Sequence, residues 1–152
     1  MKINSVSKND YEEIMDIWLR GNIKAHNFID KKYWLFNYDA VKNDNLPKSD
    51  NFKCIVDTEI AGFVSVVNSN YIGALFVAEK YQNTGVGSAL LEYCVEKYHS
   101  LTLNVYVKNA QAVKFYKHHG FHVIREMSTN GENAYIMGID YKKPDDGEIH
   151  FF

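Results

Sequence analysis

The chain has 152 residues, of which 46% are hydrophobic and 24% charged, and its formal net charge is −2 at pH 7. This length fits one domain that can bury a core without a metal or disulfide scaffold, and the mixed charge excludes a broad basic surface for nucleic acid. No run reaches the roughly 20 apolar residues of a membrane span, so we expect a cytoplasmic protein with no nucleic-acid or membrane partner. Cys54 and Cys94 are expected to be reduced, buried thiols.

The first elements predicted are a strand and an amphipathic helix. Residues 2–6 favour a strand, and Ser7 followed by Asp10 has the spacing of a capping box at a helix start. Gly21 predicts the end of this helix. Its apolar face is formed by residues at helical spacing: Tyr11, Ile14, Met15 and Trp18.

A second helix and three strands follow. The helix is expected after Asp30, with aromatic residues crowded into residues 33–38, and the Asn, Asp and Pro of residues 43–47 predict its end. The runs rich in β-branched and aromatic residues that predict strands are residues 52–56, 60–67 and 71–77.

The second half of the chain predicts a helix, a strand and another helix. The helix that begins at Gly85 has an apolar stripe suited to packing on a sheet. Residues 101–107 predict the next strand, Asn109 is suited to cap the following helix, and Gly120 predicts its end.

A closing hairpin is expected from residues 121–127 and 134–141, with Asn130-Gly131 between them. We therefore expect one domain over residues 1–143, followed by a C-terminal tail over residues 144–152 whose role the pattern does not assign.

The segment from residue 75 to residue 91 is the most informative, because it joins a strand, a glycine turn and a helix. Gly85 and Gly87 allow the backbone to approach a ligand, and free amides at a helix N-terminus favour phosphate. Ser88 stands where a P-loop needs lysine, and Leu90 stands where a dinucleotide fingerprint needs a small residue. The remaining pattern is Gln-x-x-Gly-x-Gly from Gln82.

A second segment, residues 103–121, contains a strand, an Asn-x-x-Ala helix start and a Tyr-x-x-x-Gly-Phe close. Together the two segments resemble the GNAT superfamily of N-acetyltransferases, whose pyrophosphate loop is Gln/Arg-x-x-Gly-x-Gly/Ala. Residues 14–19 and 25–29 are also similar to a group of small bacterial members.

The resemblance implies an α/β (α+β) fold, with a twisted, mostly antiparallel mixed sheet of about six to seven strands flanked by four helices. Strands four and five would splay around acetyl-CoA, the backbone of residues 75–77 would pair with its pantetheine arm, and the amides of residues 83–88 would bind its pyrophosphate. The implied cofactor-binding residues are Leu75, Phe76, Val77, Gln82, Asn83, Thr84, Gly85, Val86, Gly87, Ser88, Asn104, Asn109, Ala112 and Phe115.

The resemblance also implies that Tyr116 protonates the departing CoA thiolate, although the same residue suits a packed aromatic position on an amphipathic helix. The oxyanion would meet a backbone amide near residues 75–77. Related N-terminal acetylases carry a Glu where Asn104 stands, and an amide cannot act as a base at neutral pH. The candidate bases are His26 and a water relayed by Tyr71 or Asn104.

The acceptor is expected to be a primary amine, from either a protein lysine or N-terminus or a small molecule. Candidate acceptor-binding residues are Trp18, His26, Phe28 and Tyr71, whose rings suit an ammonium group. No metal is expected from His118 and His119, because adjacent helix residues point to different faces. The alternative function is a non-catalytic acyl-CoA-binding sensor or partner module, and both monomer and homodimer stay open.

Overall fold

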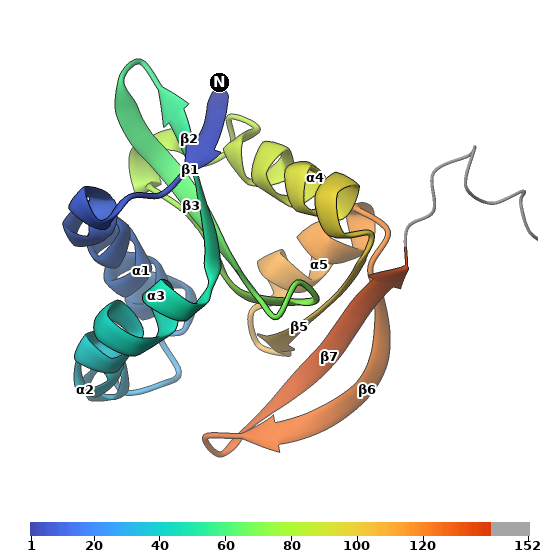
Figure 1. Ribbon diagram of the computed structural model, residues 1–152. Coiled ribbons are helices and arrows are strands. Elements are labelled where there is room, and N and C mark those ends of the chain that lie inside the picture. Colours follow the sequence, from blue (N-terminus) through green and yellow to red (C-terminus); the bar gives the residue numbers. More distant parts are fainter. Residues whose placement is uncertain (141–152) are drawn as a thin grey trace, which may run out of the picture.

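A seven-stranded sheet organises the part of the chain that the computed structural model describes, residues 1–140 (Figure 1). The strands lie in the order β1-β2-β3-β4-β5-β7-β6, and every neighbouring pair is antiparallel except β4 and β5, which are parallel. This confirms the expected mixed, mostly antiparallel sheet. The predicted tail lies outside the described residues. The strands are β1 (Lys2–Ser5), β2 (Asp50–Val56), β3 (Glu59–Val67), β4 (Tyr71–Val77), β5 (Ser100–Tyr106), β6 (His122–Thr129) and β7 (Glu132–Asp140).

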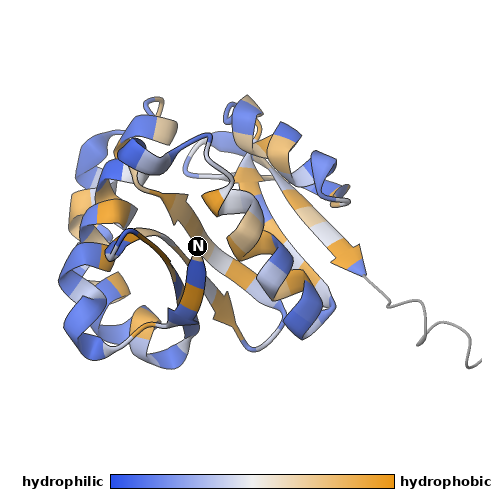
Figure 2. Cartoon of the chain, turned by 90° about the horizontal axis from the view of Figure 1, so that it is seen from above, coloured by the Kyte–Doolittle hydropathy of each residue, from blue (hydrophilic) through white to orange (hydrophobic). Residues whose placement is uncertain are grey.

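Helices cover the two faces of the sheet. Figure 1 shows α1, α2 and α3 on one side and α4 and α5 on the other, and Figure 2 shows hydrophobic stretches in the strands between them. A 3₁₀ turn at Lys8–Asp10 precedes α1, and another at Glu79–Tyr81 follows β4. The helices are α1 (Tyr11–Ala25), α2 (Lys31–Ala40), α3 (Leu46–Lys48), α4 (Val86–Tyr98) and α5 (Ala110–His118).

Three predicted helix starts are confirmed by side-chain caps. The amide of Ser7 donates to Asp10 Oδ2 (2.8 Å), which forms the expected capping box. Asp30 Oδ1 accepts from the amide of Lys32 (2.9 Å). Asn109 caps α5 in the same way, because its Oδ1 accepts from the amide of Ala112 (3.3 Å). These local signals survive folding because each cap involves residues within one helical turn.

The prediction that α1 ends at Gly21 is wrong. The helix continues to Ala25, and a Cβ atom at position 21 would lie 2.5 Å from Cδ1 of Phe76. Gly21 therefore lets α1 approach β4 closely, and it does not mark a helix end.

The predicted break at residues 43–47 is also wrong. The chain stays helical through a π turn at Val41–Asn45 and then forms α3. The amide of Leu46 donates to the carbonyl of Val41 at the end of the π turn, and Pro47, which has no N–H, cannot extend that pattern by one more residue.

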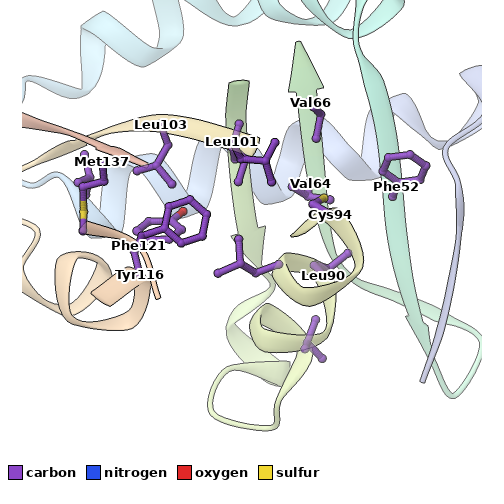
Figure 3. Packing of buried hydrophobic residues seen from close by; sticks show 14 of the residues in the cluster. Phe52, Val64, Val66, Leu90, Cys94, Leu101, Leu103, Tyr116, Phe121 and Met137 are labelled. Atoms are coloured by element: carbon purple, nitrogen blue, oxygen red, sulfur yellow. The ribbon is translucent and has the colours of Figure 1, made fainter. Parts of the chain in front are cut away.

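Two hydrophobic cores lie on opposite faces of the sheet. The larger core packs α4 and α5 on the strands, and Figure 3 shows side chains from both helices and the sheet meeting there. Cys54 and Cys94 are buried free thiols in this core, as expected, and burial raises the pKa of Cys94 to about 12. The smaller core packs α1 and α2, with Ile14, Met15, Trp18, Trp34 and Phe63 among its members.

The parallel strands β4 and β5 pair at one point and then separate. Their only residue pair is Tyr71 with Thr102. A bulge follows at once, because Ser65 faces Ala74 while Val66 faces Ile72, which leaves Gly73 as the extra residue. Bulges bend the strand that carries them. The edge of β4 that faces β5 is therefore open over residues 75–77.

Candidate active site

A cavity of about 350 Å³ lies where the end of β4 meets the N-termini of α4 and α5. It brings together residues that are far apart in the sequence. They come from β4, from the glycine loop and from the second motif. The predicted residues that line it are Leu75, Phe76, Val77, Gln82, Asn83, Gly85, Gly87, Ser88, Asn109, Ala112, Phe115 and Tyr116.

The glycine loop is shaped to present backbone amides to this cavity. Gly85 has φ 91° and Asn83 has φ 63°, both in the left-handed region that favours Gly and Asn. Ala89 donates its amide to the carbonyl of Gly85 (3.0 Å), so the amides of residues 86–88 precede the first hydrogen bond of α4. Unpaired amides and the positive end of the helix dipole attract phosphate oxygens at such a place.

Two residues of the predicted loop set do not line this cavity. The hydroxyl of Thr84 donates to the carbonyl of Tyr81, which closes the turn before the helix. The side chain of Val86 is 1% exposed and packs in the larger core. Both side chains therefore hold the loop in shape, while the amide of Val86 stays among the free amides of the first turn.

Sequence reasoning missed three residues that line the cavity, Gly21, Ala25 and Gln111. Gly21 and Ala25 are four residues apart on one face of α1, and small side chains at this spacing are a signal of close approach by another element. That signal was present in the sequence, but glycine near the end of a helical pattern also suits a helix stop.

A second cavity, of about 110 Å³, lies between β4 and β5. It shares Leu75, Phe76, Asn109, Ala112 and Tyr116 with the first, so the two cavities meet. We call the first the cofactor cavity and the second the reaction cavity. Asn104 lines only the reaction cavity, together with His26 and Tyr106.

Tyr116 lies in the wall of both cavities and is also a core residue. Its ring packs against Phe115 and Phe121, with centroid distances of 5.3 and 5.7 Å, and Figure 3 shows it beside Phe121. Burial raises the pKa of its phenol, with smaller contributions from Cys94 and Tyr71. The phenol therefore keeps its proton at neutral pH, as a general acid must.

His26 ends α1 and is 9% exposed. Its Nε2 lies 3.2 Å from Asn109 Nδ2 and its Nδ1 lies 3.1 Å from Asn22 Oδ1. Burial lowers the pKa of His26 from 6.5 to about 4. The imidazole is therefore neutral at pH 7, with a hydrogen-bond partner at each nitrogen.

The other three predicted acceptor-binding residues, Phe28, Tyr71 and Trp18, do not line either cavity. Phe28 packs edge-on against Tyr106 (5.4 Å) beside the reaction cavity. Tyr71 lies at the point where β4 and β5 pair, and burial raises its pKa while a hydrogen bond with the backbone of Asn104 lowers it. Trp18 is 7% exposed in the smaller core and lines neither cavity. Tyr106 was missed, because its alternation pattern is that of any strand residue.

The histidines near the end of α5 do not converge on a common point with acidic or thiol ligands. His119 Nδ1 donates to the carbonyl of Phe115 (2.9 Å), and its Nε2 lies 3.7 Å from Glu92. Within residues 1–140, no group of three or more His, Cys, Asp or Glu side chains could hold a metal ion.

The family of this chain follows from its match to a known family model. A family model described as an acetyltransferase (GNAT) domain matches residues 24–144. The chain belongs to the GNAT acetyltransferase family.

Relatives of this GNAT domain include two proteins of Escherichia coli K12. The chain is 32% identical to the peptidyl-lysine N-acetyltransferase YiaC over 122 residues. This alignment covers 80% of this chain and 84% of YiaC. It is 30% identical over 132 residues to the peptidyl-lysine N-acetyltransferase YjaB, covering 86% and 89% of the two chains.

Solved structures agree with this fold. The apo form of YjaB from Escherichia coli superposes with a TM-score of 0.77 at 26% identity, covering 93% of this chain and 98% of that one. The yncA protein of Salmonella typhimurium, solved with its cofactor acetyl-CoA, superposes with a TM-score of 0.64 at 17% identity. The superposition covers 94% of this chain and 95% of that one.

No helix within the described residues is both long and apolar enough to cross a membrane.

Proposed function

We propose that this GNAT protein is an acetyl-CoA-dependent N-acetyltransferase that moves the acetyl group directly to a primary amine while both substrates are bound. The observation that carries the proposal is the reaction cavity, which opens where β4 and β5 separate and which has Tyr116 in its wall. The cofactor cavity meets it from one side. An amine and a thioester can therefore reach the same point, which is what direct transfer requires.

The residues present fit acetyl-CoA. The amides of residues 86–88 would donate to its pyrophosphate, and the open edge of β4 at residues 75–77 would pair with the amides of the pantetheine arm. Gln82 Nε2 donates to the carbonyl of Val77 (3.3 Å), which holds the loop against the end of β4. The acetyl-CoA in yncA, which has the same fold, is consistent with this use of the cavity.

Bound acetyl-CoA would supply the acetyl thioester as the electrophile. An amide on the open edge of β4 would donate to the carbonyl oxygen as negative charge develops there. The C–N bond would form as the C–S bond breaks, and the phenol of Tyr116 would give its proton to the leaving sulfur. The proton lost by the amine would then restore the phenol through solvent.

The route for the proton of the amine is proposed to be a water beside Asn104 and Tyr71, relayed to solvent. Asn104 lacks a basic group, but its amide can orient a water in the reaction cavity. His26 is the other candidate base. Its Nε2 already has a hydrogen-bond partner in Asn109, and its pKa of about 4 makes it a weak base at neutral pH.

We propose a protein lysine as the acceptor. YiaC and YjaB are named as peptidyl-lysine N-acetyltransferases. A reaction cavity of about 110 Å³ also suits one unbranched alkylamine better than a branched or polycyclic amine. A small linear amine is the second candidate, because it would satisfy the same volume.

The test is thiol release from acetyl-CoA with lysine peptides, N-terminal peptides, polyamines and amino acids, using wild type and Tyr116→Phe. We expect Tyr116→Phe to lower kcat by about 100-fold, because general acids contribute about 10²- to 10⁴-fold, while acetyl-CoA affinity measured by calorimetry stays the same. Tyr98→Phe is the matched control, since the hydroxyl of Tyr98 donates to Asp50 (2.8 Å) away from both cavities.

Two results would contradict the proposal. Wild-type turnover by Tyr116→Phe would remove the acid role. Tight acetyl-CoA binding without turnover on any amine would instead favour the non-catalytic acyl-CoA-binding module, in which Tyr116 is only a core aromatic.

A further inference from the structure

A chain of hydrogen bonds, buried at its α1 end, joins the end of α1 to the start of α5. Asn22 Nδ2 donates to the carbonyl of Trp18 (3.0 Å), and Asn22 Oδ1 lies 3.1 Å from His26 Nδ1. His26 Nε2 lies 3.2 Å from Asn109 Nδ2, across 83 residues of sequence. Asn22 is 3% exposed and His26 9%, while Asn109 is partly buried in the wall of both cavities, so the chain is shielded from water at its α1 end.

The two ends of this chain allow only one protonation state for His26. Because Asn22 Nδ2 already donates to a carbonyl, the Oδ1 atom facing His26 must accept, so Nδ1 of the imidazole carries a proton. Because Asn109 Oδ1 accepts from the amide of Ala112 (3.3 Å), Nδ2 of Asn109 faces His26 and must donate, so Nε2 carries none. A second proton on the imidazole would set N–H against N–H.

Three rings hold the imidazole in this orientation. Trp34 packs against it in a tilted arrangement, with a centroid distance of 5.4 Å and an angle of 31° between planes. Tyr106 and Phe28 contact it edge-on at 5.0 and 5.8 Å. Reorientation of His26 would therefore require movement of residues from α2, β5 and the segment after α1 together.

We propose that His26 is a positioning residue, which fixes the side-chain amide of Asn109 and thereby the first turn of α5 in the wall that the two cavities share. Asn109, Ala112 and Tyr116 all line both cavities, and all lie on or at the start of α5. His26 transfers no proton in this role. It connects α1, on one face of the sheet, to the helix on the other face that carries the acid. The kinetic consequences rest on the function proposed above.

Substitutions at His26 separate positioning from base catalysis. His26→Phe keeps a ring but removes the acceptor, and we expect it to weaken acetyl-CoA binding about tenfold, the effect of losing one hydrogen bond, with kcat at saturation changed less than about threefold. His26→Gln offers an amide oxygen to Asn109 and is expected to restore the affinity. The proposal fails if His26→Gln loses kcat as strongly as His26→Phe while acetyl-CoA binding stays intact. In that case the acidic limb of the pH profile of kcat would also disappear, and His26 would be a base.

A spectroscopic experiment tests the inference without turnover. A long-range ¹H–¹⁵N spectrum of the full-length protein should show His26 protonated at Nδ1 and unprotonated at Nε2 at neutral pH. Asn109→Asp keeps an oxygen for the amide of Ala112 but replaces the donor by a carboxylate oxygen, so both nitrogens of His26 should become protonated near neutral pH.

A proton on Nε2 of the wild type, or an unchanged imidazole in Asn109→Asp, would overturn the inference. A wild-type protein that binds acetyl-CoA but acetylates nothing would contradict only the proposed function, because the spectra and the affinities of the His26 variants still decide the positioning role.

Discussion

Gly21→Ala tests the close approach of α1 to β4. Glycine inside a helix is less favourable than alanine by about 1 kcal/mol, so the substitution should stabilise the protein if position 21 has room. It has none, because the new methyl group would lie 2.5 Å from Cδ1 and 3.2 Å from Cγ of Phe76. Forcing a methyl group into a packed site costs about 1 to 3 kcal/mol. We therefore expect a net loss of about 1 kcal/mol.

Thermal unfolding without ligand measures this balance. For a chain of this size, a loss of about 1 kcal/mol lowers Tm by about 2 to 4 °C. Gly87→Ala is the matched control in α4, because its methyl group would lie 3.5 Å from the nearest atoms of Phe115 and Val77, an ordinary contact. We expect no loss of Tm there. A second prediction of the same contact is that Gly21→Ala combined with Phe76→Leu loses less than the sum of the single changes. A rise in Tm for Gly21→Ala would refute the packing argument.

Two further predictions concern the loop and the buried histidine. Gly85→Ala should cost about 1 to 2 kcal/mol, because Gly85 has φ 91°, and should weaken acetyl-CoA binding in calorimetry, whereas unchanged affinity would mean that the loop shape does not matter for the ligand. His26 has a folded pKa of about 4 against 6.5 for the unfolded chain, so the unfolded state binds the proton first as pH falls. The contribution of neutral His26 to the free energy of unfolding is therefore complete above pH 6.5. It falls by up to about 3 kcal/mol between pH 6.5 and pH 4. Urea unfolding between pH 7 and pH 4 should show this additional loss in the wild type and not in His26→Gln, which keeps the contribution of carboxylates with a lowered pKa such as Asp10. Neighbouring Tyr106, whose pKa burial raises, stays neutral throughout this range. Equal slopes would contradict the assigned pKa.

The local elements of this protein follow from its sequence. The strand predicted at residues 71–77 is β4 as observed, the caps at Ser7 and Asn109 lie where the pattern placed them, and α2 begins after Asp30 as expected. The glycine loop after β4 was also readable, because a left-handed Gly85 and a following helix are set by neighbouring residues. Such features depend on interactions within a turn or two, so a sequence pattern carries them.

Only the tertiary structure decided how these elements meet. The sequence pattern predicted a helix end at Gly21, yet in the fold Gly21 faces Phe76. Trp18, which was expected to bind the acceptor, lies in the smaller core. Neither the opening between β4 and β5 nor the bulge that accompanies it has a signature in either strand alone. The protonation state of His26 depends on an asparagine 83 residues away. Periodicity tells which face of an element is apolar, but the partner of that face is chosen by packing among distant segments, and the reaction cavity exists only after that choice.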